Sequence, residues 1–404
     1  MRLRELELAE FRSFRSLHLS IAPAGFRLIG PNASGKSSLL EAIAMLATMR
    51  SPRTSAEREI ANWQSGADLA VPPYARLRAE FDRLDGAHQI EIGLSVEDRE
   101  GGPLKKRPRF DDRPVRAIDA VGHLKTVLFS PEDVDLLAGS PSLRRRYIDM
   151  ATSQASRTYL RALSRFGRVL EQRNSLLRRF ARDGVRSDAA RPAEELTFWN
   201  SELTMSAAEV LAMRLGVIAY VSSRARVHYH ALTGDDTLGM AYATPRLNME
   251  AELLPGDDWQ APSQSMRQGI AAAFAASLQT TAVEEFRRGV TVVGPHRDDF
   301  AVTASGIDIG RFGSRGQQRL AVIAVKLGEL DLLETAAAEP PILLLDDVLS
   351  ELDARHREKI VAVLASRNAQ ICVTATDVTD LAATELAHVP LIEIDGGVIE
   401  LSTA

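Results

Sequence analysis

The chain of 404 residues is longer than one hydrophobic core usually allows, so we expect two domains. Its 49 Lys and Arg residues and 54 Asp and Glu residues give a formal net charge of −5, which argues against a uniformly basic protein that coats DNA. The one cysteine, Cys372, excludes an internal disulfide and lies in an apolar run, where a buried and unreactive thiol is expected.

The sequence gives no sign of export or of membrane insertion. Residues 1–14 mix charged residues with single apolar ones and lack the apolar segment of a secretory signal. No uninterrupted apolar run reaches the roughly 18 residues that a membrane-spanning helix requires. We therefore expect a cytoplasmic protein with no membrane partner, and a reducing compartment suits a chain without disulfides.

Hydrophobic periodicity predicts an α/β segment in the first third of the chain. Alternation with a period of two predicts strands, and a helix is predicted over residues 36–49, after a glycine-rich loop. The pair Asp85-Gly86 between two alternating runs predicts a β-hairpin. Residues 99–113 are polar and are expected to form a mobile loop. The predicted strands lie at residues 6–8, 17–21, 26–29, 74–81, 88–96 and 124–129.

The pattern changes after Pro131. Residues 141–232 have helical periodicity almost throughout, residues 233–265 are rich in loop-forming residues, and residues 266–288 are helical again. The last third alternates strands with helices, which is typical of a parallel sheet covered by helices. The predicted strands are 290–293, 300–303, 342–345, 370–375 and 391–394, and the predicted helices are 316–336, 353–366 and 378–386.

These elements predict an α/β domain that a helical insertion divides in the sequence. We expect an N-terminal part at residues 1–133, an inserted helical domain at residues 134–288 and a C-terminal part at residues 289–404. The insertion lacks sustained heptads and is too short for a long antiparallel coiled coil.

Residues 30–37 match the P-loop pattern G-x-x-x-x-G-K-[ST], between a predicted strand and a predicted helix. Glycines let the backbone N–H groups of such a loop point at phosphate oxygens, and the helix N-terminus adds its dipole. Lys36 would act as a catalytic residue by placing its charge beside the terminal phosphates of ATP, and Ser37 would bind Mg²⁺. The expected ATP-binding residues are Gly30, Pro31, Asn32, Ala33, Ser34, Gly35, Lys36, Ser37 and Ser38.

A second motif is the apolar run at residues 342–345, which ends in two acids as a Walker B strand does. We expect Asp346 to hold Mg²⁺ and Asp347 to polarise the attacking water as a catalytic residue. Solvated acids at the end of a strand would give the same pattern. The P-loop earlier in the chain favours the nucleotide-binding interpretation.

A third motif indicates the class of ATPase. Ser314, Gly316 and Gln317 open a predicted helix before the Walker B strand and match the Ser-x-Gly-Gln signature of ABC-type ATPases. In that class the signature contacts, in trans, the γ-phosphate of ATP held by the partner subunit. Ser350 and Asp353 follow Walker B in the position of a D-loop. The ordered set predicts an ATPase that acts as an ATP-dependent homodimer.

Many ABC ATPases place a switch histidine after the strand that follows Walker B. Residues 373–377 contain no histidine, so Thr376, or Asp377 beside it, would have to sense the γ-phosphate. The missing histidine and the arginine-rich insertion argue against the main alternative, which is a nucleotide-binding subunit of an ABC transporter.

Beyond these shared motifs, the chain resembles the RecF family from its first strand to at least Asp377. The segments that carry the resemblance are residues 11–14, 129–133, 139–141, 145–149, 172–174 and 294–299. The resemblance implies an α/β fold, an ABC/SMC-type P-loop ATPase head with an inserted α-helical domain. It also implies that Arg12 lies near the nucleotide phosphates, although a solvated arginine at a strand end fits equally. Arg315 departs from the glutamine more frequent in the family and leaves the signature residues in place.

The resemblance also implies a function and partners. Proteins of this family act as recombination mediators that bind double-stranded DNA or the junction beside a single-stranded gap. They bind ATP and Mg²⁺, dimerise on ATP, hydrolyse it slowly, and help RecR and RecO to load RecA in DNA repair and replication restart. Single-stranded DNA is a further expected partner.

Arginines clustered at residues 141–182 offer a surface for DNA. Four of them have helical spacing and share one stripe, which could follow phosphates without reading the DNA sequence. A solvated helix face or intramolecular ion pairs would explain the same stripe. Two arginines just after the P-loop helix form a second candidate patch. The expected DNA-binding residues are Arg157, Arg161, Arg165 and Arg168 in the stripe, and Arg50 and Arg53 in the second patch.

Overall fold

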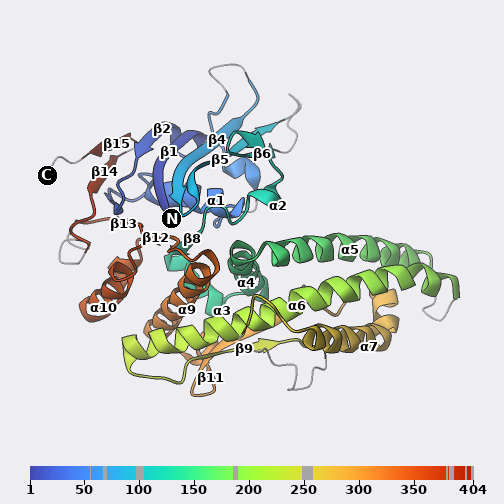
Figure 1. Cartoon of the computed structure of the whole chain (residues 1–404). Helices are drawn as coiled ribbons and strands as arrows, with labels where there is room; N and C mark the ends of the chain where they lie inside the picture. The colour runs from blue at the N-terminus through green and yellow to red at the C-terminus, as the bar shows by residue number, and fades with distance from the viewer. Residues whose placement is uncertain are drawn as a thin grey trace. The chain divides into compact units, whose positions relative to one another are not determined.

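The computed structural model describes the chain except for residues 55, 67–70, 97–103, 185–189, 248–257, 379–380, 382–385, 396–397 and 402–404. The described residues form two compact units (Figure 1). Unit 1 comprises Met1–Asp133 and Glu329–Ala404, and unit 2 comprises Val134–Gly328. The first division coincides with the boundary expected from the sequence. The second boundary, expected after residue 288, instead follows Gly328.

Unit 1 contains a mainly parallel sheet with the strand order β15-β14-β3-β13-β12-β8. The strands β12 (Ile342–Asp346) and β13 (Ile371–Ala375) are buried along their whole length, as expected for a parallel sheet covered on both faces. Because β3 (Gly25–Ile29), β13 and β12 run parallel, their carboxyl ends meet at one edge of the sheet. The remaining strands are β8 (Thr126–Phe129), β14 (Leu391–Asp395) and the antiparallel β15 (Val398–Leu401).

Helix α1 (Lys36–Thr48) follows β3 and agrees with the prediction from the sequence. It ends where Met49 takes a left-handed conformation at φ 57°. Helix α9 (Arg315–Ala337) begins in unit 2 and ends in unit 1. The helix predicted at residues 378–386 lies largely outside the described residues. The other helical segments of this part are η1 (Glu57–Glu59), α2 (Ala117–Ala120), η2 (Pro131–Val134), η4 (Val348–Glu351) and α10 (Ala354–Ala365).

The second sheet of unit 1 is antiparallel, with the order β2-β1-β4-β5-β6-β7. The predicted hairpin is confirmed, because β4 (Tyr74–Arg83) pairs with β5 (Gly86–Val96). The predicted loop at residues 99–113 is wrong for its second half, where β6 (Leu104–Phe110) pairs with β5 and buries Leu104 and Pro108 between exposed basic residues. The remaining strands are β1 (Arg2–Phe11), β2 (Phe14–Ser20) and β7 (Arg113–Pro114).

Unit 2 is mainly helical and carries a small antiparallel sheet of the order β11-β10-β9. The strand β9 (Gly239–Ala243), which periodicity did not reveal, pairs with β10 (Asp299–Ala304), so residues after 288 belong to this unit. The strand predicted at residues 290–293 is wrong, because Thr291 N donates to Asn174 Oδ1 and Val292 N to Glu285 Oε1. The other elements are α3 (Asp135–Ala138), α4 (Pro141–Ala155), α5 (Arg157–Arg182), α6 (Ala190–Thr233), α7 (Gln264–Arg288), β11 (Ile307–Asp308) and α8 (Ile309–Phe312).

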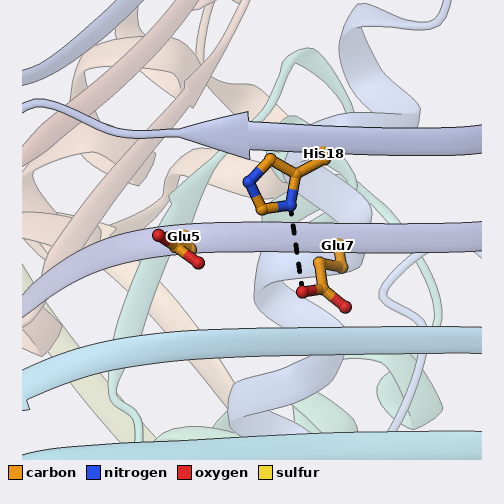
Figure 2. A group of neighbouring side chains, drawn as sticks. All are labelled: Glu5, Glu7 and His18. Carbon is orange, nitrogen blue, oxygen red and sulfur yellow. Dashed lines mark ion pairs between the residues drawn. The ribbon is translucent and has the colours of Figure 1, made fainter.

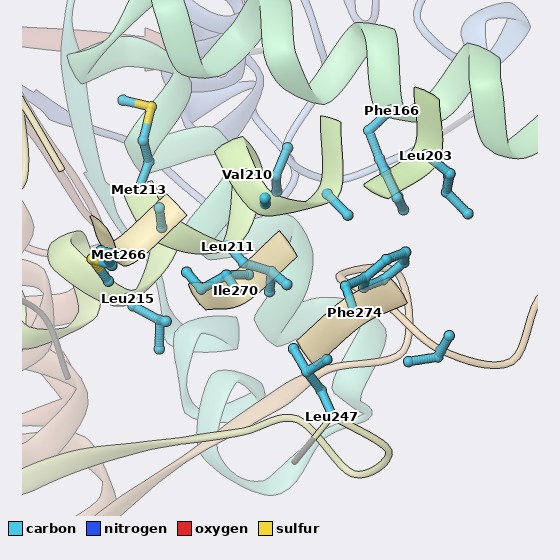
Figure 3. Packing of buried hydrophobic residues seen from close by; sticks show 14 of the residues in the cluster. Phe166, Leu203, Val210, Leu211, Met213, Leu215, Leu247, Met266, Ile270 and Phe274 are labelled. Carbon is cyan, nitrogen blue, oxygen red and sulfur yellow. The ribbon is translucent and has the colours of Figure 1, made fainter. Parts of the chain in front are cut away.

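The hydrophobic core of unit 2 lies among α5, α6 and α7 (Figure 3). Phe166 of α5, Leu203 and Leu211 of α6, and Phe274 of α7 are buried in it. The segment Glu194–Thr233 of α6 is long and apolar enough to cross a membrane, which the search for an uninterrupted apolar run did not reveal, but 72% of its most apolar window is buried. The packing of unit 2 therefore accounts for the apolar character of α6.

Two arginines are buried within unit 2. The Arg173 side chain is 2% exposed, and its Nη2 donates to the fully buried Glu285 Oε2 at 2.6 Å. Arg214, also 2% exposed, donates to Asp149 Oδ1 at 2.7 Å and to the carbonyl O of Pro295 at 2.7 Å. Segments 145–149, 172–174 and 294–299, which carry part of the family resemblance, thus contribute residues to the hydrogen bonds of these two buried arginines.

Arg173→Met should lower the free energy of unfolding of unit 2 by about 3–5 kcal/mol, because it leaves Glu285 buried without a cation. Arg165→Met on the same helix is the matched control. Arg165 pairs with Glu202 but is 49% exposed, so its loss should cost less than about 1 kcal/mol. Urea denaturation of the two variants measures the difference, and equal losses would show that burial of the pair does not decide its contribution.

Candidate nucleotide site

The P-loop connects β3 to α1 in unit 1. Ala33 (φ 64°) and Gly35 (φ 112°) adopt left-handed conformations that turn the loop into the N-terminus of α1. A Cβ on Gly35 would lie 2.9 Å from Ser13 Oγ, so the turn between β1 and β2 leaves room only for glycine. Lys36 is buried, and its Nζ donates to the carbonyl O of Gly30 at 2.8 Å. The ammonium group therefore lies inside the curve of the loop.

Two features of this loop fit a bound triphosphate. Ser34 Oγ is buried and has no hydrogen-bond partner among the described residues, so a phosphate oxygen would satisfy it. The residues on the outer side of the loop, Pro31, Asn32 and Ala33, are exposed. Ser38, the second residue after Lys36, is half-buried in the first turn of α1.

The Walker B aspartate lies beside the P-loop helix. Asp346 Oδ1 accepts hydrogen bonds from Ser37 Oγ at 2.8 Å and from Thr374 Oγ1 at 3.0 Å. Burial raises the pKa of the Asp346 carboxyl above its ordinary value, while the hydrogen bonds from Ser37 and Thr374 and the charge of Arg53 act in the opposite direction. A buried carboxylate beside a hydroxyl provides the hard oxygen ligands that Mg²⁺ prefers.

Asp347 follows at the end of β12 in a left-handed conformation, with φ 51°. Its backbone N donates to Thr374 Oγ1 at 3.0 Å, and its carbonyl O accepts from Ser350 Oγ at 2.7 Å. The bend turns the chain away from the strand direction directly after Asp346. The backbone at Asp347 is therefore fixed on both sides, as a residue that positions water requires.

Thr374 is the residue of this site that sequence reasoning missed. Its hydroxyl contacts the side chain of Asp346 and the backbone of Asp347, whereas Thr376, the predicted switch residue, lies exposed beyond the end of β13. The sequence feature that could have revealed Thr374 is a threonine near the carboxyl end of the strand that follows Walker B. The role of Thr376 stays a prediction.

Arg12 lies in the turn between β1 and β2, and its guanidinium donates hydrogen bonds to other residues of the same unit. Its Nη2 and Nε donate to the two carboxylate oxygens of the buried Glu41, at 2.7 and 3.0 Å. Its Nη1 donates to the carbonyl O of Glu59 at 2.6 Å. Arg12 thus ties the loop after α1 to the middle of that helix, and its predicted contact with phosphate stays a prediction.

The signature residues open helix α9 as a capping box. Ser314 N donates to Gln317 Oε1 at 2.9 Å, and Gln317 N donates to Ser314 Oγ at 3.3 Å. Ser314, Gly316 and Gln317 are exposed, and nothing lies within 4 Å of a Cβ placed on Gly316. Because unit 2 extends to Gly328, these residues belong to unit 2, whereas the P-loop belongs to unit 1.

The predicted D-loop residue Asp353 begins α10. Its Oδ1 accepts from His356 N at 3.0 Å, and its side chain is 65% exposed. Donation from the backbone and side chain of His356 holds the pKa of the Asp353 carboxyl below its ordinary value. Asp353 is therefore an exposed, ionised cap on a helix that begins just after the Walker B acids.

Comparison with known proteins identifies the family. Residues 2–390 match the RecF/RecN/SMC N-terminal domain family. A DNA replication and repair protein RecF of Thermomicrobium roseum is 43% identical over 403 residues, covering 99% of this chain and 100% of the relative. The chain belongs to the RecF family. A second member, RecF of Chloroflexus aurantiacus, is 40% identical and covers 98% of this chain and 99% of the relative.

The solved structures agree on the fold. The recombination mediator protein RecF with ATP, of the RecFOR pathway, superimposes with a TM-score of 0.82 at 26% identity, covering 99% of this chain and 97% of that chain. A Smc head domain derived from Pyrococcus furiosus reaches a TM-score of 0.50 at 14% identity, covering 99% of this chain and 95% of that chain, and shows the fold alone. The chain is thus an SMC-like ATPase of the ABC type, as the sequence motifs predict.

The arginine stripe predicted from helical spacing lies on the exposed side of α5. Arg165 Nη2 donates to Glu202 Oε2 at 2.6 Å, in agreement with the ion-pair alternative. Arg161 and Arg168 have no ion pair within the described ranges of the chain. Arg157 is exposed as well. The stripe therefore contains two arginines whose charge no described carboxylate neutralises.

The second candidate patch consists of two exposed arginines in the segment after α1. Arg50 is exposed directly after α1. Arg53 is exposed as well, and its charge lowers the pKa of the Asp346 carboxyl against the larger, opposite effect of burial. The predicted contact of Arg53 with DNA stays a prediction.

Glu5, Glu7 and His18 gather on the charged face of the antiparallel sheet (Figure 2). Their possible ligand atoms lie within 4.8 Å of one another. Glu7 Oε1 is 3.8 Å from His18 Nδ1 and 3.3 Å from Arg78 Nη1. These ion pairs account for Glu7, and we assign no metal to the group.

Asp347→Asn should bind ATP like the parent protein but hydrolyse it at least about 100-fold more slowly, because an amide cannot polarise the attacking water as a carboxylate does. Calorimetric titration with ATP and a phosphate-release assay measure the two effects separately. Lys36→Ala, the control for the loop itself, should abolish hydrolysis and ATP-dependent dimerisation. Loss of ATP binding by Asp347→Asn would instead make this carboxylate a metal ligand or a structural group.

Proposed function

We propose that the chain binds ATP with Mg²⁺ at the P-loop and hydrolyses it slowly. Lys36 holds the terminal phosphates, Ser37 and Asp346 bind Mg²⁺, and Asp347 polarises the attacking water. The hydrogen bond of 2.8 Å between Ser37 and Asp346, residues 309 positions apart, carries this proposal. Bound Mg²⁺ supplies positive charge that stabilises the phosphoryl group during transfer.

ATP-dependent dimerisation is the second part of the proposal. Ser314, Gly316 and Gln317 contact the γ-phosphate of ATP held by a second copy of the chain. Support comes from their exposure at the N-terminus of a long helix, where the helix dipole favours an anion. The exposed D-loop residues Ser350 and Asp353 lie at the same dimer contact.

The dimer acts on DNA as a recombination mediator. It binds duplex DNA or gap junctions through the exposed arginines of α5 and helps to load RecA together with RecR and RecO in the cytoplasm. Two observations support this: Arg161 and Arg168 pair with no described carboxylate, and a similar solved protein is a recombination mediator of the RecFOR pathway. Membership of the RecF family removes the transporter subunit as an alternative.

Ser314→Arg should leave ATP binding by the monomer intact and block the ATP-induced dimer, because the new side chain fills the space meant for the phosphate of the partner copy. Sedimentation with and without ATP measures the dimer, and calorimetry measures binding. Ser314→Ala is the milder control and should weaken the dimer less. Loss of ATP binding in the Ser314→Arg monomer would place the signature in cis and refute the composite site.

Replacing Arg161 and Arg168 together with Gln should weaken DNA binding equally for all sequences. The slope of log affinity against log salt should fall by up to about 0.9 for each phosphate of duplex DNA that an arginine no longer neutralises. Arg246→Gln with Arg288→Gln is the control of equal charge, because both of these arginines pair with Glu284 in the same unit. A salt slope that changes as much in the control would show that net charge, and not the stripe, governs binding.

A further inference from the structure

Trp63 is 95% exposed, the largest fraction among the large apolar side chains that the structure describes. It follows the loop after α1 in unit 1. An indole so exposed contributes nothing to the packing of this protein. Its large flat face is available to a ligand, and aromatic faces bind nucleobases by stacking.

The backbone around Trp63 is fixed on both sides. Asn62 N donates to the carbonyl O of Glu10 at 2.8 Å, and Asn62 Nδ2 donates to the carbonyl O of Arg12 at 2.7 Å. Gln64 N donates to Asn62 Oδ1 at 2.9 Å, which closes a turn around Trp63. The indole is thus carried on a rigid turn and not on a loose loop, so a stacked ligand would cost little ordering of the backbone.

This turn is attached to the residues that pack on the P-loop. Arg12, whose carbonyl O accepts from Asn62, is followed by Ser13, whose Oγ lies 2.9 Å from a Cβ placed on Gly35. Arg12 also joins Glu59 in the preceding segment to Glu41 of α1. Trp63 therefore lies on the segment that borders the P-loop on the side of the β1–β2 turn.

We infer that Trp63 stacks on the adenine base of the ATP bound at this P-loop. The inference rests on the proposed function. Phosphates held between Gly30 and Ser37 leave the ribose and the base outside the loop. The bordering segment then offers an aromatic face to the base, while the loop itself contacts only phosphate. Stacking of this kind adds affinity for the nucleoside part and none for the phosphates.

The test compares ATP with inorganic tripolyphosphate, which carries the phosphates without a base. Trp63→Ala should weaken ATP binding about 10-fold, within the range found for loss of one base–aromatic stack, and leave tripolyphosphate binding unchanged. Trp63→Phe should restore most of the ATP affinity. Leu84→Ala, at another exposed apolar side chain of unit 1 that is 75% exposed, is the matched control and should change neither affinity.

Fluorescence gives an independent measurement. The chain has three tryptophans, so the difference between the parent protein and Trp63→Phe isolates the signal of Trp63. ATP should quench this signal and tripolyphosphate should not. Thermal unfolding should show the same midpoint for Trp63→Ala and the parent, since the side chain is not packed.

Three outcomes overturn the inference. ATP affinity of Trp63→Ala within twofold of the parent would show that the base does not rest on the indole. Equal losses for ATP and tripolyphosphate would make Trp63 a support of the loop. Unchanged ATP binding with weaker single-stranded DNA binding would assign the indole to nucleic acid. Failure of the parent to bind ATP would refute the proposed function itself, which is a separate result.

Discussion

The two hydrogen bonds that Asp346 accepts, from Ser37 and Thr374, constrain the rest of unit 1. The three residues come from segments far apart in the sequence, and they meet only because β13 lies between β3 and β12 in the sheet. The register pairs Asp346 with Thr374 and Thr374 with Leu28. A slip of one residue would turn every side chain to the opposite face, so the buried apolar strands fix the position of one polar cluster at their carboxyl ends.

Unit 2 shows that arginine serves two physical purposes on one helix. Arg173 of α5 is buried with Glu285 and joins the helix to α7, whereas Arg161 and Arg168 of the same helix face solvent without an ion pair in the described part of the chain. The buried arginine contributes to the stability of the fold, because its removal would leave the carboxylate of Glu285 buried without a cation. The exposed ones cost little to keep in water and can bind phosphates. Burial, and not residue type or spacing, separates the two.

The sequence predicts the motifs that consist of neighbouring residues. It fails where contacts between distant segments determine the local structure. The P-loop, the Walker B acids and the hairpin after Tyr74 are patterns of neighbouring residues, and all lie where expected. Strand β6 was missed because its partner β5 and its buried Pro108 give it order despite a polar composition. Thr291 and Val292 resemble a strand in sequence, yet side chains of α5 and α7 satisfy their backbone. Thr374 reaches Asp346 only through the fold, because β13 pairs with β12.

Ser37 and Asp346 lie side by side where we propose that Mg²⁺ binds next to the P-loop. Calorimetric titration of ATP, with Mg²⁺ and with chelator, in the parent protein and in Asp346→Asn tests it most directly. We predict that Mg²⁺ raises the ATP affinity of the parent by about 10-fold or more, and that Asp346→Asn loses this gain while it keeps the parent affinity in chelator. An equal gain from Mg²⁺ in both proteins would show that Asp346 does not hold the ion.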